Sequence, residues 1–298
     1  MKILGGYKNG NYNVTIFDDG TKIRENKEDY FEADFPECMD IKITNFCDMG
    51  CKYCHENSSV KGEHGDILNA EFIDTLRPFT ELAIGGGNPL SHPDLMEFLK
   101  KLKEKKIIAN MTVNQTHFQL HQNVINDLIR TENDLIKGLG ISLTNPSDEF
   151  IEQVKQYPNA VIHVIAGVVT LEQLEKLSDN GLKILILGYK EFRRGEEYYQ
   201  EHSDTVNKNI EDLKEALPTL IEKFKVVSFD NLAIEQLAVK KLMSEDEWNE
   251  FYMGDDGKFT MYIDMVNKQF ARSSTSKVRY DLKPTIDEMF RAVKECLE

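Results

Sequence analysis

The chain has 298 residues, of which 41% are hydrophobic and 29% are charged, and its formal net charge at pH 7 is −15. This composition is typical of a globular protein of one large domain or two ordinary ones, and the acidic excess disfavours nucleic acid and anionic membranes as partners. No apolar run approaches the roughly 18 residues that a membrane span needs, and the N-terminus lacks the apolar core of a signal peptide. We therefore expect a cytoplasmic protein that makes no membrane contact.

Residues 1–37 predict a β-hairpin extension at the N-terminus. In the stretch NYNVTIFDDGTKI, alternating apolar residues flank the turn-forming Asp18, Asp19 and Gly20. This is the pattern of two antiparallel strands joined by a short turn. No residue in the segment suggests a chemical role, so we expect it to lie at an edge of the main fold.

From residue 38 to residue 230, apolar runs alternate with amphipathic stretches of helical period. This alternation predicts parallel β-α units, and the continuous apolar runs are typical of strands covered on both faces. A full or partial barrel and an open doubly wound sheet both remain possible, and in either one ligands bind at the carboxyl ends of the strands. The predicted strands are CMDIKITNF, ELAIGGG, IIANMTVNQ, IKGLGISLT, AVIHVIAGVVT, KILILGY and VVSFD. The predicted helices between them are LNAEFIDTLRPF, PDLMEFLKKLKEKK, QNVINDLIRTENDL, DEFIEQVKQY, LEQLEKLSDNG and NIEDLKEALPTLIEKF.

Residues 231–298 depart from the alternation. They predict a helix–hairpin–helix extension that packs on the β-α units and is not a free domain. Its parts are a longer helix over LAIEQLAVKKLMSEDEWNEF, a pair of strands over FTMYIDMVNKQFAR and a terminal helix over PTIDEMFRAVKECLE.

Three of the five cysteines, Cys47, Cys51 and Cys54, fall within the stretch CDMGCKYCH. In a chain that we expect to be cytoplasmic, this cluster indicates metal binding or catalysis and not a disulfide framework. Thiolates suit zinc or an iron–sulfur cluster. A structural zinc ion needs four ligands, and His55 would complete the set. Alternatively, three thiolates on a 4Fe–4S cluster leave one iron open to a substrate or cofactor.

The pattern Cys-x3-Cys-x2-Cys resembles the motif of the radical S-adenosylmethionine (SAM) superfamily. In that family it lies in the loop after the first barrel strand, with an aromatic residue before the third cysteine, as Tyr53 is here. The stretch AIGGGNP, residues 83–89, resembles the glycine-rich motif after the second strand, with Gly87-Asn88 where Gly-Glu is commoner. The resemblance implies an α/β fold with a partial (β/α)6 barrel, a partial TIM barrel, over residues 38–230. The hairpin and the C-terminal α/β extension would flank this barrel.

The same resemblance implies an enzyme with one 4Fe–4S cluster and S-adenosyl-L-methionine. The three cysteines would hold three irons, and SAM would chelate the fourth. An electron from a reductant such as flavodoxin or ferredoxin would cleave SAM, and the resulting 5′-deoxyadenosyl radical would abstract hydrogen from a substrate. The extension contains only Cys296 as a further thiol, so we expect a single cluster. The positions that match SAM-binding segments of the family are Tyr53, Gly85, Gly86, Gly87, Asn88, Asn114, Ser142 and Gly167.

The substrate is less defined. The motif region most resembles the branch of molybdopterin-precursor and peptide-modifying enzymes, and the appended extension favours a peptide or protein over a nucleotide-like small molecule. Lys190, Arg193 and Arg194 follow the sixth strand and are candidates for an anionic substrate group, or form a solvated charged loop. Asp230 either contacts substrate or caps the next helix. The competing class is a non-catalytic zinc-binding module that uses Cys47, Cys51, Cys54 and His55.

Overall fold

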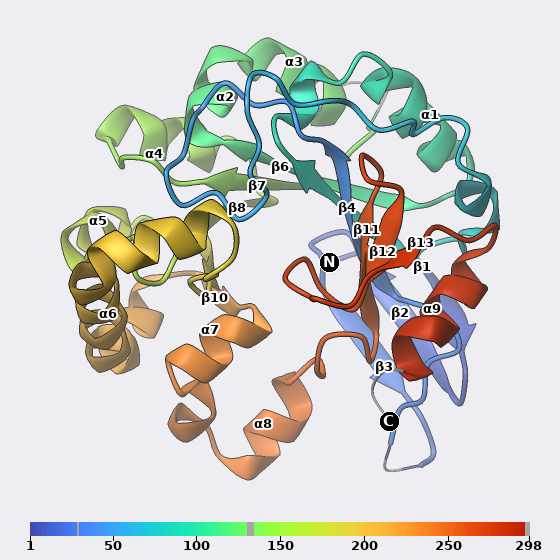
Figure 1. Ribbon diagram of the computed structural model, residues 1–298. Helices are drawn as coiled ribbons and strands as arrows, with labels where there is room; N and C mark the ends of the chain where they lie inside the picture. Colours follow the sequence, from blue (N-terminus) through green and yellow to red (C-terminus); the bar gives the residue numbers. More distant parts are fainter. Residues whose placement is uncertain (29, 130–133, 296–298) are drawn as a thin grey trace.

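The computed structural model describes residues 1–28, 30–129 and 134–295. Its centre is a curved ten-stranded sheet with the order β10-β9-β8-β7-β6-β5-β4-β11-β12-β13 (Figure 1). Within the described residues the sheet does not close, because β10 and β13 remain its two edges. The strands are β4 (Cys38–Thr44), β5 (Glu81–Gly86), β6 (Ile108–Asn114), β7 (Gly138–Ser142), β8 (Ala160–Ile165), β9 (Lys183–Leu187), β10 (Val226–Phe229), β11 (Thr260–Asp264), β12 (Gln269–Ala271) and β13 (Tyr280–Asp281).

Strands β4 to β10 pair in chain order and all run parallel, which confirms the predicted α/β class. The helices that connect them lie along the outer, convex face of the sheet (Figure 1). They are η1 (Glu71–Thr75), η2 (Pro89–Ser91), α1 (Leu95–Glu104), α2 (Gln115–Leu120), α3 (Gln122–Ile129), α4 (Asp148–Lys155), α5 (Leu171–Leu177), α6 (Arg194–Leu220) and η3 (Ile221–Lys223).

One predicted helix is longer in the structure and another is shorter. The predicted helix NIEDLKEALPTLIEKF is the last part of α6, which already begins at Arg194. The stretch LNAEFIDTLRPF forms only the short 3-10 helix η1, whose backbone becomes extended at Leu76. Pro78 disfavours helical backbone at the residue before it, which explains the early end. The last part of the predicted helix QNVINDLIRTENDL lies outside the described residues.

The alternation of side chains along the strands separates a buried apolar face, which packs beneath the helices, from a concave inner face. On β4, Met39, Ile41 and Ile43 are buried in the core beneath the helices. The intervening Asp40 and Lys42 belong to the other, concave face. The concave face therefore carries charged residues at β4, whereas the convex face carries the hydrophobic packing.

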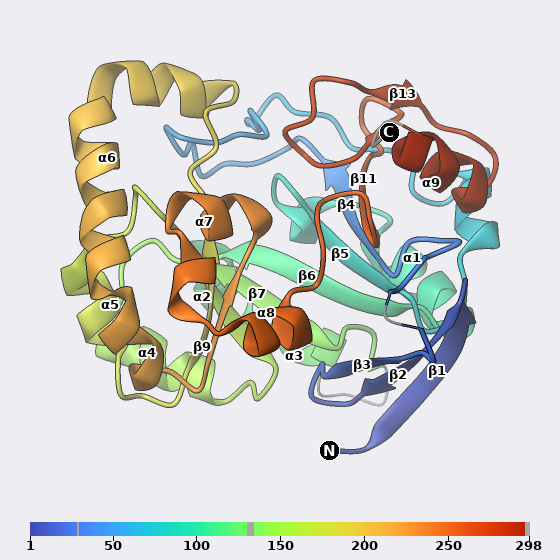
Figure 2. The ribbon, with the colours of Figure 1, turned by 90° about the horizontal axis from the view of Figure 1, so that it is seen from below.

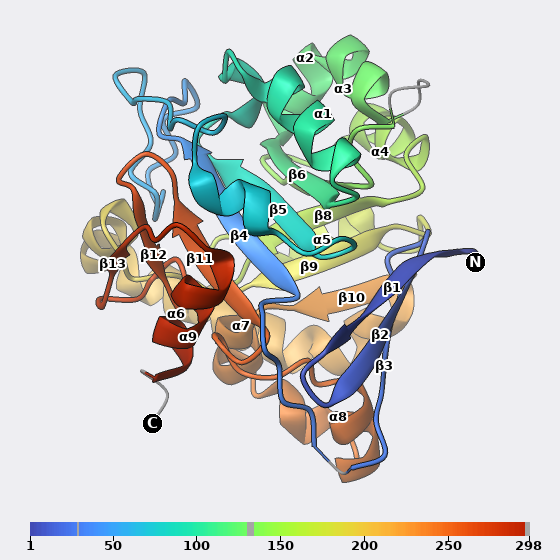
Figure 3. The ribbon, with the colours of Figure 1, turned by 90° about the vertical axis from the view of Figure 1, so that its right-hand side faces the viewer.

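The C-terminal segment completes the sheet beside β4. Strand β11 pairs with β4 in parallel, and β12 and β13 follow in antiparallel order. The predicted pair of strands is therefore present, but its first strand joins the main sheet, so that β4 lies between β5 and β11. Figure 3 shows β11 to β13 and the terminal helix α9 (Ile286–Glu295) beside β4. Cys296 lies outside the described residues.

The predicted long helix after residue 231 is divided into three pieces. These are α7 (Asn231–Gln236), the 3-10 helix η4 (Val239–Leu242) and α8 (Glu245–Phe251). Ala238 adopts a left-handed conformation with φ of 52°, which interrupts the helix. Ser244 and Glu247 then form a capping box that starts α8.

The N-terminal residues form a separate antiparallel sheet of β1 (Ile3–Asn9), β2 (Tyr12–Phe17) and β3 (Lys22–Glu25). The predicted hairpin corresponds to β2 and β3, and β1 is an additional strand. Figure 2 shows this sheet as a layer of its own. It is attached through the buried Glu37, which accepts hydrogen bonds from Tyr12 Oη at 2.5 Å and Arg24 Nε at 2.8 Å. Among the described helices, none is long and apolar enough to cross a bilayer.

Candidate active site

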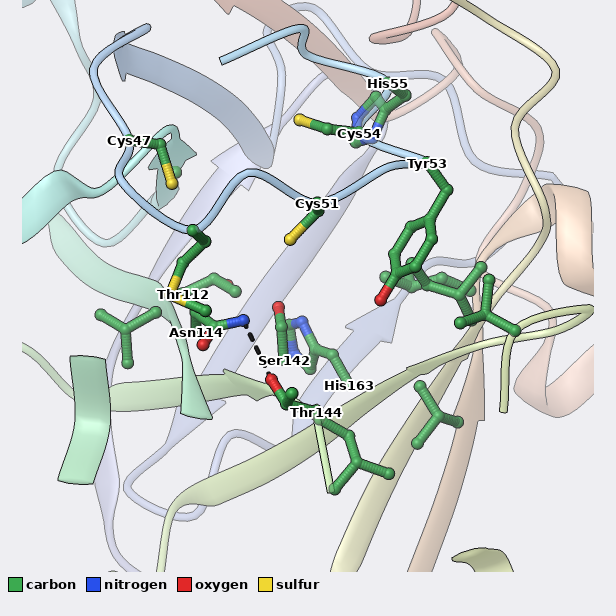
Figure 4. Close-up of a pocket in the computed structure, with 18 of the residues that line it drawn as sticks. Cys47, Cys51, Tyr53, Cys54, His55, Thr112, Asn114, Ser142, Thr144 and His163 are labelled. Atoms are coloured by element: carbon green, nitrogen blue, oxygen red, sulfur yellow. Dashed lines mark hydrogen bonds between the residues drawn. The ribbon is translucent and has the colours of Figure 1, made fainter. Parts of the chain in front are cut away.

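A cavity of about 250 Å³ lies where the cysteine loop after β4 meets the carboxyl ends of β5 to β9 (Figure 4). Parallel α/β sheets bind ligands at this edge. The structure therefore brings together most of the residues singled out from the sequence. Those that line the cavity are Cys47, Cys51, Tyr53, Cys54, His55, Gly85, Gly86, Gly87, Asn114 and Ser142.

The thiols of Cys47, Cys51 and Cys54 point toward a common space at the cavity wall (Figure 4). All three are free and half-buried. Burial raises the pKa of the Cys47 and Cys51 thiols, and the positive charge of Arg194 partly opposes this rise. The loop thus holds three soft sulfur ligands at the rim of one cavity.

The interpretation as a compact zinc site is not matched by the geometry. In the part of the chain that the structure describes, no three His, Cys, Asp or Glu side chains are close enough to hold a single metal ion. His55 instead directs its Nε2 toward Glu56 Oε1 at 3.5 Å. Burial, with the nearby charge of Lys190, lowers the pKa of His55 to about 3, so the ring is neutral.

The cysteine loop is anchored on both sides. Asp48, directly after Cys47, accepts a hydrogen bond from the buried His117 of α2, with Nε2 and Oδ1 2.6 Å apart. On the other side, Glu56 contacts Lys42 of β4 with 3.0 Å between Nζ and Oε2, and it accepts a hydrogen bond from Tyr262 of β11 at 3.0 Å. The loop is therefore fixed by contacts with α2, β4 and the C-terminal strand.

The three glycines after β5 have different structural roles. A Cβ on Gly86 would lie 2.5 Å from the carbonyl oxygen of Thr44, and one on Gly87 would lie 2.1 Å from that of Phe46. These two glycines let the β5 loop pass closely beside the start of the cysteine loop, where Gly87 N–H donates to Thr44 O at 2.8 Å. In contrast, a Cβ on Gly85 would have no described neighbour within 4 Å. Gly85 is the position at which the bare backbone faces the cavity.

Two of the predicted SAM-binding residues do not line the cavity. Asn88 is buried and caps η2, with its Oδ1 accepting from Leu90 N–H at 3.2 Å. Gly167 has φ of +83°, and a Cβ there would meet Val206 of α6 at 2.7 Å. Gly167 therefore makes room for α6, whereas its neighbours Ile165 and Val168 line the cavity.

The four predicted substrate residues also lie outside this cavity and contact protein groups. Lys190 Nζ donates to Ser274 Oγ at 3.1 Å, and Arg193 Nη1 donates to the carbonyl oxygen of Glu56 at 3.0 Å. Arg194 donates to the carbonyl oxygen of Ser58. Asp230 accepts from Ala233 N–H at 2.8 Å and caps α7, which is the capping alternative considered for this residue.

Several cavity residues were missed by the sequence reasoning. They come from the inner face of the sheet or from the loops beside it, and His163 of β8 is the most distinctive. Burial lowers the pKa of His163 to about 4, so a neutral imidazole faces the cavity. The period-2 alternation of AVIHVIAG places His163 on the inner face, and this signal was available. The missed polar residues are Ser58, Thr112, Thr144, His163 and Gln173.

A sequence model of the Radical SAM superfamily matches residues 41–234. The chain therefore belongs to the radical SAM superfamily and is an enzyme of that class, as its cysteine pattern predicted. Membership implies the use of SAM and usually of a 4Fe–4S cluster.

Individual relatives agree with this assignment. A stretch of 73 residues is 30% identical to the probable GTP 3′,8-cyclase of Methanococcus maripaludis and covers 22% of this chain and 24% of the cyclase. The structure of Streptococcus suis SuiB bound to S-adenosylmethionine matches with a TM-score of 0.59 at 16% identity, over 87% of this chain and 66% of SuiB. SuiB bound to precursor peptide SuiA gives a TM-score of 0.56 at 16% identity, over 87% and 65%. The chain thus spans about two thirds of SuiB and about a quarter of the cyclase.

Proposed function

We propose that Cys47, Cys51 and Cys54 hold one 4Fe–4S cluster and that the cavity beside them binds SAM. The observation that carries the proposal is the convergence of three free thiols of one loop on a common space next to this cavity. The residues fit the group because thiolates are the usual ligands of such clusters.

A bound cluster would supply the electron that cleaves SAM into methionine and a 5′-deoxyadenosyl radical, which abstracts hydrogen from the substrate. The chain would bind and orient SAM and exclude water from it. Asn114 and Ser142 are candidates to bind its polar groups, and Tyr53, Ile165 and Leu187 provide apolar surface. The backbone at Gly85 allows close approach.

We further propose that residues 38–230 form the catalytic unit, with residues 1–37 and 231–298 as extensions packed against it. The thiol ligands and a reducible cluster suit the reducing cytoplasm, with flavodoxin or ferredoxin as the electron donor. A peptide or protein substrate is supported by the extension beside β4 and by the similarity in fold to SuiB, whose structure holds a precursor peptide. A nucleotide-like small molecule is the second candidate, because the matched stretch of the probable GTP cyclase favours it.

Anaerobic reconstitution with iron and sulfide tests the cofactor proposal. We expect a brown protein with about four irons per chain that yields 5′-deoxyadenosine with dithionite and SAM. The triple variant Cys47→Ala/Cys51→Ala/Cys54→Ala should lose both properties, whereas Cys38→Ala, at the opposite end of β4, should keep them. A colourless wild-type protein that binds one zinc ion and produces no 5′-deoxyadenosine would overturn the proposal.

The substrate class is tested by deuterium transfer. Lysate from cells grown in D2O is separated into a peptide and protein fraction and a small-molecule fraction, and each is incubated with the reduced enzyme and unlabelled SAM. Mass spectrometry should find deuterium in 5′-deoxyadenosine with the first fraction. Labelling confined to the second fraction would replace the peptide proposal by the small-molecule one.

A further inference from the structure

Two buried hydrogen-bond donors beside the cysteine loop have no acceptor in the part of the chain that the structure describes. Ser58 is 2% exposed, and its Oγ has no hydrogen-bond partner among the described residues. The Nε of Arg194 is likewise buried and unpartnered within the described structure, although another nitrogen of the same guanidinium donates to the carbonyl oxygen of Ser58. The guanidinium of Arg194 is therefore held by the backbone of Ser58, while Arg194 Nε and Ser58 Oγ each remain an unused donor.

Ser58 brings both donors to the wall that carries the thiols. It lines the same cavity as Cys47, Cys51 and Cys54. Arg194 does not line the cavity, but its guanidinium donates to the carbonyl oxygen of Ser58 and so lies beside that wall.

The backbone around α6 places Arg194 there. The side chain of Arg193, the residue before it, binds the carbonyl oxygen of Glu56, and Arg194 binds that of Ser58. Gly195 allows the turn to be tight, since a Cβ at this position would lie 2.2 Å from the carbonyl oxygen of Lys190. Two consecutive arginines therefore fasten the start of α6 to the segment that follows Cys54.

Unpartnered buried donors of this kind need an explanation. Buried polar groups are nearly always hydrogen-bonded, and leaving one unsatisfied costs about 1–3 kcal/mol. The neighbouring groups that would accept are the thiolates of the loop and the sulfides of a cluster bound to them. Hydrogen bonds and positive charge directed at these sulfur atoms stabilise the more negative, reduced form of a cluster.

We propose that Ser58 and Arg194 donate hydrogen bonds to the sulfur atoms of the cysteine-bound cluster and raise its reduction potential. This inference rests on the proposed function, since it requires the cluster. It also gives Arg194 a task at the cofactor in place of the substrate contact considered from the sequence.

The test measures the reduction potential of the reconstituted protein without SAM, by a redox titration followed by electron paramagnetic resonance. The variants are Ser58→Ala, Arg194→Gln and Arg194→Lys. Lys208→Gln is the matched control, because Lys208 is an exposed cation on the same helix and pairs with Asp212 on the helix surface. Iron and sulfide contents are determined first, so that only fully loaded samples are compared.

We expect Ser58→Ala and Arg194→Gln each to make reduction about tenfold less favourable, which lowers the potential by about 59 mV for a one-electron couple. Arg194→Lys keeps the charge and loses the Nε donor, so its shift should be smaller. Lys208→Gln should match the wild type. In addition, the apoprotein of Ser58→Ala should be at least as stable as wild-type apoprotein, because the substitution removes a hydroxyl that bonds nothing there.

Unchanged potentials in fully loaded Ser58→Ala and Arg194→Gln would overturn the inference. Unchanged potentials together with weaker SAM binding would also overturn it and would assign the donors to the carboxylate of SAM. If Arg194→Gln fails to assemble a cluster, the decision falls to Ser58→Ala, which keeps the arginine and the carbonyl group that it binds. Failure of the wild type to assemble any cluster would instead contradict the proposed function.

Discussion

Nε2 of His117 lies 2.6 Å from Oδ1 of Asp48, so that helix α2 holds the cysteine loop through one side-chain pair. His117 is 3% exposed at its side chain, whereas Asp48 is 59% exposed. The hydrogen bond from His117 holds the pKa of Asp48 below its usual range. A rigid helix therefore fixes the position of the residue directly after Cys47.

Removal of this pair should loosen the loop without unfolding the protein. We expect His117→Ala and Asp48→Ala each to cost about 1 kcal/mol of stability and to speed the loss of iron from the reconstituted protein to a chelator several-fold. Asp48→Asn keeps an acceptor oxygen for His117 and should lose iron more slowly than Asp48→Ala. Equal iron retention in wild type and His117→Ala would show that the pair does not support the cluster.

Gly85 and Gly140 provide a matched pair of glycine-to-alanine changes. A Cβ on Gly140 would lie 2.5 Å from both His163 Cε1 and Thr112 Oγ1, so Gly140→Ala should destabilise the protein by about 1–3 kcal/mol. Gly85 has an open surrounding and lines the cavity. Gly85→Ala should therefore be stable to within about 0.5 kcal/mol but bind SAM about tenfold more weakly, a loss of about 1.4 kcal/mol.

Urea unfolding and calorimetric titration with SAM separate the two effects. A stable Gly85→Ala protein with wild-type affinity would place SAM away from the β5 loop. A stable Gly140→Ala protein would mean that the side chains of β6 and β8 have room to move apart.

Lys42 is a buried cation between two carboxylates. Its Nζ lies 3.0 Å from Glu56 Oε2 and 3.2 Å from Asp264 Oδ2, and the three side chains are at most 8% exposed. Lys42→Met should destabilise the protein by about 3–5 kcal/mol, because it leaves Asp264 buried without its counter-charge and leaves Glu56 with the more distant Arg193 Nη1, at 3.4 Å. The exposed pair of Lys214 and Glu211 is the control, and Lys214→Met should change stability by less than about 1 kcal/mol. Similar urea midpoints for Lys42→Met and Lys214→Met would contradict the stabilising role of the buried Lys42.

His163 predicts a pH dependence of stability. Burial lowers its pKa from 6.5 to about 4 in the folded state, so between these values the unfolded chain binds more protons. The contribution of neutral His163 to the free energy of unfolding is therefore complete above about pH 6.5. It declines as the pH falls toward 4, by about 2 kcal/mol between about pH 7 and pH 5. The variant His163→Asn should lack this part of the decline. An identical pH profile for the two proteins would show that His163 is solvated in the folded state.

The sequence predicts the parallel β-α order well, because each strand is a continuous apolar run and each helix has a clear amphipathic period. It also predicts the cysteine loop and the glycines at the cavity, because their spacing is local and specific. Local roles were harder to anticipate. Asn88 and Gly167 match the family pattern by position. In the structure, the side chain of Asn88 caps η2, and Gly167 leaves space for Val206 of α6.

Contacts between distant segments could not be predicted. Nothing in the periodicity of residues 260–264 identifies β4 as their partner, since any exposed strand edge would satisfy the same hydrogen bonds. For the same reason, the charges of Lys42, Glu56 and Asp264 looked unrelated in the sequence. They form one network only because β11 and the cysteine loop both lie beside β4.

The pairing of β11 with β4 also bears on the order of events during synthesis. Lys42 and Asp264 are 222 positions apart, so the strand that leads into the cysteine loop has an open edge and an incomplete charge balance until the ribosome has passed residue 264. Contacts this distant close late and slowly. We therefore expect the loop to reach its final shape only after β11 has been made. Iron delivery would then follow the synthesis of β11, and a nascent chain halted before β11 would present an unpaired edge prone to aggregation.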